Sequence, residues 1–434
     1  MSTWQNWSGL ETVRDLRQVH ADDVADIQAE VRRARSNGET LKAAGTGHSF
    51  TGIARPAHAQ LLPDGWVGIT AVDRDAMQVT ALAGTKLSVF NAALENLGLS
   101  LHNMGDIAEQ TLAGAISTGT HGTGGSTASL SAQVVGLELV TGTGDVLQVN
   151  ATEHPEMLDL ARVGLGALGV LTSVTFAVEP LFLLRAQEQP MAWADALAAF
   201  DELAATHDHV DMYWFPHTDR ILTKRNTRIG TDLSAAEPLP GWRAWLDDDL
   251  LSNRVFGWQT ALLNHAPRAI PAANRLASAL LGPRTYADAA HRVFTTERRV
   301  VFREMEYAVP RDAGLAALRA CRAAIESANL AVSFPVEIRV APAENVALST
   351  AYGRDSFYLA FHTHRGADHR EYFALMEEIV RDHGGRPHWG KLHTCEAADL
   401  ATLYPRFAEF VDARTRLDPD RVFSNDYLEH VLGS

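Results

Sequence analysis

The sequence has only two cysteines, Cys321 and Cys395, which lie far apart and offer neither a disulfide framework nor a metal-binding spacing. No segment contains the roughly 18 consecutive apolar residues that a membrane-spanning helix needs. The amino terminus also lacks the basic start and apolar stretch of a secretory signal. These absences predict a reduced, cytoplasmic protein with no transmembrane segment.

Basic residues are also scarce and nowhere form a run. The chain has 38 lysines and arginines against 53 acidic residues, which gives a net charge of −15. Such a charge would repel the phosphates of a nucleic acid, so we expect no nucleic-acid partner. The hydrophobic content of 46% and the length of 434 residues indicate a globular protein of two or three domains.

Glycine is concentrated where chemistry is expected. Gly45-Thr46-Gly47-His48 follows a short apolar run at residues 40–44. Glycine tolerates positive φ, and successive N–H groups in such a turn can form a cradle for phosphate. The common dinucleotide fingerprint fails here, because Phe50 stands where the third glycine belongs. An ordinary surface turn therefore remains the alternative reading.

The order of patterns along the chain predicts an α+β fold. A helix is expected over residues 21–37, a second glycine-rich passage over 114–125, a hairpin over 134–149 and an apolar strand over 170–178. We place a first domain at residues 1–180 and a second at 181–400. The remainder, residues 401–434, is too short for a domain and is expected to return to the first.

Val336-Glu337-Ile338-Arg339-Val340 alternates apolar and charged residues. In a strand, Glu337 and Arg339 would project from one face, where they could share a polar pocket and bind hydroxyl or carbonyl groups. The alternative is a half-exposed strand whose charged face is solvated.

Two other patterns are weaker. Residues 385–391 match the spacing of a phosphate-binding P-loop, but Leu392 stands where serine or threonine should ligate magnesium. We interpret this segment as a rigid turn that presents Lys391. His362, His364, His388 and His393 lack the arrangement of a zinc site, so no metal is expected.

Three motifs occur in one order: Gly45-Thr46-Gly47-His48-Ser49-Phe50, Thr118-Gly119-Thr120-His121-Gly122-Thr123-Gly124 and His388-Trp389-Gly390-Lys391. With Glu337-x-Arg339 and Ala351-Tyr352-Gly353-Arg354-Asp355, they resemble the sugar-lactone oxidase branch of the vanillyl-alcohol-oxidase-type flavoproteins. That branch includes the gulono-, galactono- and arabinono-1,4-lactone oxidases or dehydrogenases, and it is related to the alditol oxidases. The likeness is greatest to actinobacterial gulonolactone dehydrogenases.

The resemblance implies an FAD-binding domain of two α+β subdomains, followed by an α+β substrate (cap) domain with an antiparallel sheet. It implies FAD, with a covalent bond to the flavin through His48. The implied cofactor-binding residues are Ala44, Gly45, Thr46, Gly47, His48, Ser49, Thr111, Gly114, Thr118, Gly119, His121 and Val170.

The implied reaction is hydride transfer from a CH–OH carbon of a sugar-derived lactone, L-gulono-1,4-lactone or a related aldonolactone, to flavin N5. Glu337, Arg339 and Lys391 would be catalytic, and Asp106, His362 and His388 would contact substrate. Asp106 and His362 stand where alditol oxidases carry serine and threonine, which disfavours a polyol such as xylitol or sorbitol. An alditol oxidase that makes hydrogen peroxide remains the alternative, as does a flavin- or sugar-binding protein without turnover.

The electron acceptor stays open at this stage. The resemblance implies oxygen access at Gly105, because a small residue at this position admits oxygen in the branch, but the likeness to gulonolactone dehydrogenases implies another acceptor. Oxygen and another electron acceptor are both compatible with the sequence.

Overall fold

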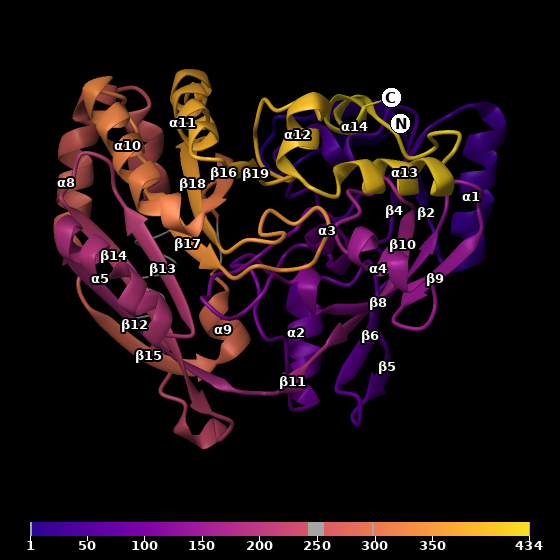
Figure 1. The fold of residues 1–434 in the computed structure, drawn as a ribbon, viewed down its shortest axis with the longest axis horizontal. Coiled ribbons are helices and arrows are strands. Elements are labelled where there is room, and N and C mark those ends of the chain that lie inside the picture. The colour runs from indigo at the N-terminus through magenta and orange to yellow at the C-terminus, as the bar shows by residue number, and fades with distance from the viewer. Residues whose placement is uncertain (1, 242–255, 297–298, 434) are drawn as a thin grey trace.

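The structure is a computed structural model that describes residues 2–241, 256–296 and 299–433. Figure 1 shows the chain's first third and its last helices on one side, and a large sheet with its covering helices on the other. Within the described residues, no helix is long and apolar enough to cross a membrane. The observed architecture is α+β, as expected.

A four-stranded sheet carries the amino-terminal glycine turn. Its order is β1 (Ser2–Gln5), β2 (Thr12–His20), β4 (Ala59–Leu62) and β3 (Leu41–Ala43), with β4 parallel to both β2 and β3. Helix α1 (Val24–Asn37) begins after the N-cap Asp23 and ends at Gly38, which adopts the left-handed conformation. Its apolar face contributes Ile27 and Val31 to the core beneath this sheet.

A second, five-stranded antiparallel sheet completes this side of the molecule. Its order is β5 (Ile69–Asp73), β6 (Gln78–Leu82), β10 (Val170–Ala177), β8 (Val134–Val140) and β9 (Val146–Asn150). The hairpin expected over residues 134–149 is confirmed as β8 and β9. Helices α2 (Leu87–Asn96), α3 (Leu112–Ser117) and α4 (Pro155–Ala161) accompany it. A short pair, β7 (Leu99–Ser100) with β11 (Glu179–Pro180), lies apart from both sheets.

The other side is built on an eight-stranded sheet in which every neighbouring pair is antiparallel. Its order is β15 (Arg284–Ala289), β12 (Leu183–Ala192), β14 (Arg220–Gly230), β13 (His209–Trp214), β17 (Val336–Ala341), β18 (Ser356–His364), β16 (Phe302–Pro310) and β19 (Arg386–Pro387).

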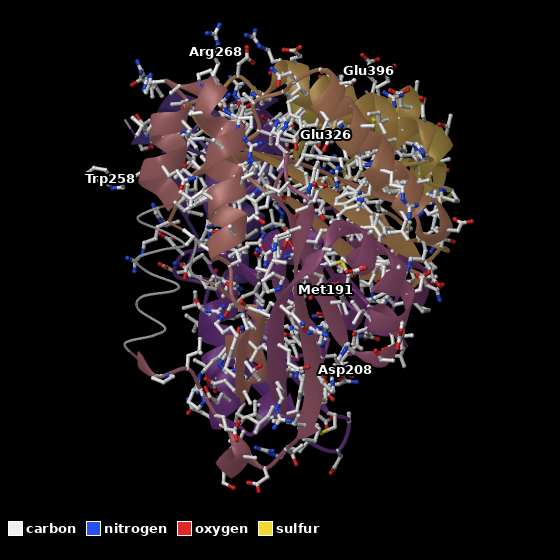
Figure 2. All side chains as sticks on the ribbon, turned by 90° about the vertical axis from the view of Figure 1, so that its left-hand side faces the viewer. Met191, Asp208, Trp258, Arg268, Glu326 and Glu396 are labelled. Atoms are coloured by element: carbon white, nitrogen blue, oxygen red, sulfur yellow. The ribbon has the colours of Figure 1, made fainter. Side chains whose placement is uncertain are left out.

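Helices cover the outer face of this sheet. α5 (Trp193–Thr206), α10 (Gly314–Ser327) and α11 (Arg370–Asp382) pack on its strands. α9 (Ala290–Phe294) contacts β12 and β15, and α7 (Phe256–Leu263) and α8 (Ile270–Leu280) precede β15 in the chain. Figure 2 views this covered side, where Glu326 on α10 and Trp258 on α7 are labelled; Trp258 is 84% exposed.

Alternation along the strands separates an apolar face from a polar one. On β17, Val336, Ile338 and Val340 belong to the hydrophobic core, so Glu337 and Arg339 project from the opposite face. That face is not solvated, because Glu337 is 4% exposed and Arg339 is 8% exposed. The strand therefore carries the shared polar pocket considered above rather than a half-exposed surface.

The carboxyl-terminal segment returns to the first sheet. Its helices are α12 (Ala397–Leu403), α13 (Phe407–Leu417) and α14 (Asp426–Leu432). The N–H of Leu41 donates to the carbonyl of Val422 (2.8 Å), and Lys42 Nζ donates to that of Phe423 (3.2 Å). These bonds hold the carboxyl-terminal segment against β3, and Figure 1 shows the two termini close together. The domain boundaries at residues 180 and 400 stay predictions.

Candidate active site

The glycine turn after β3 lines a cavity with about 980 Å³ of empty space. All six residues from Ala44 to Ser49 line it, and α3 and its N-cap contribute Thr111, Gly114 and, just beyond the helix, Thr118. Val170, at the start of β10, closes a further wall. The structure thus brings together ten of the twelve residues expected to hold the cofactor.

The main chain of the turn suits a diphosphate. Among the described residues, none accepts a hydrogen bond from the backbone N–H groups of residues 45–49. Gly47 has a φ of +71°, which lets consecutive N–H groups converge. A Cβ on Gly45 would lie 2.3 Å from Thr111 Oγ1, so only glycine permits this close approach.

Lys42 adds a cation at the base of this cavity. Its side chain is buried and donates to the carbonyls of Gly166 (3.1 Å) and Phe423 (3.2 Å). Burial lowers the pKa of Lys42 to about 7, with help from nearby Arg414. An anionic group in the cavity would favour its protonated form. Sequence reasoning missed this lysine, although a lysine inside an apolar strand was a signal.

Gly119 and His121 do not line this cavity, which differs from the expectation for them. Gly119 adopts a φ of +75° just after α3 and faces Val163. His121 is turned toward the eight-stranded sheet, where its ring stacks on Tyr358 at 3.9 Å. The chain reverses at Gly119, so His121 faces the eight-stranded sheet instead of this cavity.

A second cavity, with about 560 Å³ of empty space, adjoins the first. The two share four lining residues, His48, Ser49, Gln110 and Thr118. The second is also lined by residues from both halves of the molecule: Trp7, Gly105, Asp106, His121, Glu306, Arg339, His388 and Lys391. His48, at the junction, stacks on Trp7 at 5.5 Å.

Arg339 lies on the wall of this second cavity among three carboxylates. Its Nη2 is 2.7 Å from Glu337 Oε1 and 3.7 Å from Asp106 Oδ2, and its Nε is 3.0 Å from Asp211 Oδ1. Burial alone would lower the pKa of Arg339, but these carboxylates outweigh it and hold the pKa well above its ordinary value. Glu337 does not line the cavity and reaches it only through its contact with Arg339.

Lys391 forms a second charged cluster. It donates to Glu304, and its Nζ lies 4.0 Å from Glu306 Oε2. His362 does not line the cavity either; its Nε2 lies 3.4 Å from Glu304 Oε1. Burial would raise the pKa of Glu304, but Lys391 and His362 hold it well below its usual range.

Glu304 and Glu306 were missed by sequence reasoning. They alternate with apolar residues on β16, as Glu337 and Arg339 do on β17, and this shared pattern was the available signal. Cross-strand register places Glu304 opposite His362 on β18.

His121, Glu306 and His388 bring their ligand atoms within 4.8 Å of one another. His388 Nδ1 accepts the N–H of Gly390 (3.1 Å), which puts the proton of the neutral ring on Nε2. Burial lowers the pKa of His388 to about 3, so the ring stays neutral. A protonated Nε2 cannot ligate a metal, and the trio is better suited to handling protons.

His121 and Glu306 face each other in the wall of the second cavity. His121 Nδ1 donates to the carbonyl of Gly122 (2.8 Å), so its Nε2 faces Glu306 Oε1 at 3.0 Å. A proton taken up on Nε2 would lie directly against the Glu306 carboxylate. Burial would raise the pKa of Glu306, but His121 and Lys391 keep it at about 2.

The family model described as D-arabinono-1,4-lactone oxidase matches residues 174–431, more than half of the chain. The chain belongs to this family. A second model, described as an FAD binding domain, matches residues 17–150, which contain the glycine turn and α3. FAD is therefore the cofactor, and the chain is an FAD-dependent oxidoreductase.

Similarity to individual relatives extends over the whole chain. An L-gulono-1,4-lactone dehydrogenase of Mycobacterium tuberculosis is 38% identical, with 99% of both chains covered. An L-gulonolactone oxidase of Scyliorhinus torazame is 30% identical over 99% of this chain and 98% of its own. The crystal structure of cholesterol oxidase from B. sterolicum superposes with a TM-score of 0.83 at 18% identity, covering 99% of this chain and 96% of that chain. The expected vanillyl-alcohol-oxidase-type fold is confirmed.

Proposed function

We propose that this aldonolactone oxidase family member oxidises L-gulono-1,4-lactone or a closely related aldono-1,4-lactone at a carbon bearing a hydroxyl group. The observation that carries the proposal is the junction of the two cavities: the FAD cavity opens at His48 onto a second cavity that Arg339 and Lys391 line. When bound, FAD supplies the hydride acceptor.

The residues of the second cavity would bind and orient the substrate and stabilise charge during the reaction. Arg339 binds and orients a substrate oxygen, and Glu337 and Asp211 hold its guanidinium in place. Lys391 adds positive charge that stabilises negative charge as it develops. The neutral His388 donates through Nε2, and Asp106 accepts from a substrate hydroxyl.

His121 Nε2 is the proposed proton acceptor of the substrate hydroxyl, and the Glu306 carboxylate, 3.0 Å away, would stabilise the charge that forms on the ring. Both line the cavity, whereas Glu337, which the resemblance implied to be catalytic, is engaged with Arg339 outside it. His362 is assigned to the support of Glu304 rather than to substrate contact.

His48 is proposed as the covalent attachment point of FAD. It lies where the two cavities meet, and burial lowers its pKa. A neutral imidazole keeps the lone pair that such a bond requires.

Oxygen is proposed as one electron acceptor. Gly105 lines the second cavity without a side chain, and a Cβ there would lie 2.9 Å from Thr120 Cγ2, so a larger residue would press on the cavity wall. The cytoplasmic location stays a prediction.

A substrate profile tests the function. The purified holoenzyme is assayed with aldono-1,4-lactones and with the alditols xylitol and sorbitol, using oxygen or an artificial dye as acceptor. Turnover of lactones with little turnover of alditols is expected. Preference for alditols would favour the alditol oxidase alternative, and no turnover with either class would favour a binding protein. Peroxide formed in the oxygen arm would identify oxygen as an acceptor.

A further inference from the structure

A third cavity, with about 370 Å³ of empty space, lies behind Arg339. It shares Asp106 and Arg339 with the second cavity, so these two side chains stand between the two spaces. Strands β13 and β14 of the eight-stranded sheet contribute Asp211, Tyr213, Lys224 and Asn226 to its wall.

The strand register gathers polar groups on this wall. Lys224 and Asn226 are two residues apart on β14 and therefore share a face. Asp211 pairs directly with Lys224 across the strands, so its carboxylate joins the same face. The polar face seen on β16, β17 and β18 thus continues across β13 to β14.

Asn226 is the unsatisfied member of this group. The residue is 1% exposed, and no described residue donates a hydrogen bond to its Oδ1. A buried polar atom left in this state costs free energy, so it marks a place where a ligand can supply the missing partner. Lys224 Nζ donates to the carbonyl of Val293 (2.9 Å), and an ammonium has two further hydrogens to donate.

Charge on the wall favours a neutral ligand over an ion. The cations Lys224 and Arg339 are matched by the carboxylates of Asp211 and Asp106. A hydroxyl group both donates and accepts, which matches a wall that offers an acceptor on Asn226 beside a donor on Lys224.

We propose that this third cavity is a subsite for the exocyclic hydroxyl groups of the lactone. This inference rests on the proposed function, because it places the lactone ring in the second cavity against Arg339. The contact of 3.7 Å between Asp106 Oδ2 and Arg339 Nη2 must therefore open, with the Asp106 side chain moving aside, for the carbon chain attached to the ring to reach Asn226 and Lys224. A hexono-1,4-lactone carries a two-carbon tail with two hydroxyls, a pentono-1,4-lactone carries one hydroxymethyl group, and a tetrono-1,4-lactone carries no tail.

The test compares these three lactone classes on wild type, Asn226→Ala and Lys224→Met holoenzymes. Wild type is expected to show kcat/KM falling from the hexonolactone to the tetronolactone. Loss of one hydrogen bond corresponds to a factor of about 3 to 10, so each variant should lose about that much kcat/KM on the hexonolactone. Neither variant should change kcat/KM for the tetronolactone.

The matched control is Arg225→Met. Arg225 is the intervening residue of β14, faces the other side of the sheet and donates to Gln189 (2.6 Å). It should leave all three kcat/KM values unchanged. Flavin content and melting temperature are recorded for each variant, and the wild-type series decides alone if a variant does not fold.

Two different failures are distinguishable. If no lactone reduces the flavin, both the proposed function and the subsite are contradicted. The subsite alone is contradicted if the wild type oxidises all three lactones with equal kcat/KM. It is also contradicted if the variants lose kcat/KM equally on all three lactones, and the proposed function then still holds.

Discussion

Glu337 Oε1 lies 2.7 Å from Arg339 Nη2, and one residue separates the two on β17. Asp211, on the neighbouring strand, contacts the same guanidinium at 3.0 Å. The arginine is thus fixed from two sides while it remains on the wall of the second cavity.

Arg339→Ala should therefore abolish most turnover without loss of FAD. Removing a preorganised charged donor costs about 100-fold or more in turnover. Glu337→Gln should cost less, because Asp211 still holds the guanidinium. The measurement is kcat/KM with a lactone, normalised to flavin content. Full activity of Arg339→Ala would exclude it from the site.

His48→Ala should convert the bound flavin from covalent to releasable. Wild-type protein precipitated with acid should retain its yellow colour in the pellet, whereas the variant should leave the colour in the supernatant. Tight non-covalent binding through the amides of residues 45–49 should persist in the native variant. Wild-type colour found wholly in the supernatant would disprove the covalent bond.

Gly45→Ala should yield protein with little or no FAD. The new methyl group would lie 2.3 Å from Thr111 Oγ1, which forces the turn away from α3 and disturbs the cradle. Gly282→Ala is the matched control, because its methyl group would meet no atom within 4 Å. The ratio of flavin to protein absorbance measures the effect. Equal flavin content in both variants would refute this account of the turn.

Lys42 should make the stability of the flavin-free protein depend on pH. Its pKa is lowered from 10.5 to about 7 in the folded chain, so between these values the unfolded chain binds a proton that the folded chain does not. Stability from this group therefore rises as pH increases from about 7 to about 10.5. Bound FAD should flatten the rise, because its phosphates favour the charged lysine.

The measurement is the melting temperature against pH for wild type and Lys42→Met, each with and without FAD. The flavin-free wild type should gain more stability than Lys42→Met over this interval. Identical pH profiles for the two flavin-free proteins would rule out a lowered pKa at Lys42.

Local sequence patterns predicted much of the fold because they act over short distances. The helix that became α1 carries its own cap at Asp23 and its stop at Gly38, and the β8–β9 hairpin is joined by a glycine turn. The glycine turn at residues 45–49 could likewise be predicted as a phosphate cradle, because the residues that form it are adjacent in the sequence.

The sequence could not predict the contacts that depend on the packing of elements distant in the chain. Glu306 and His121 are far apart along the chain, and only the docking of the passage after α3 on β16 brings them to 3.0 Å. The same docking turned His121 away from the cofactor cavity. Lys224 and Asn226 carry no motif, and their position becomes meaningful only when β14 pairs with β13.

The most direct test of the account is anaerobic mixing of the holoenzyme with L-gulono-1,4-lactone while the visible absorbance of the flavin is followed. We predict rapid bleaching for wild type, much slower bleaching for Arg339→Ala at equal flavin content, and no bleaching by sorbitol. Flavin that stays oxidised in wild type with every aldonolactone would contradict the assignment of the second cavity as a site of lactone oxidation.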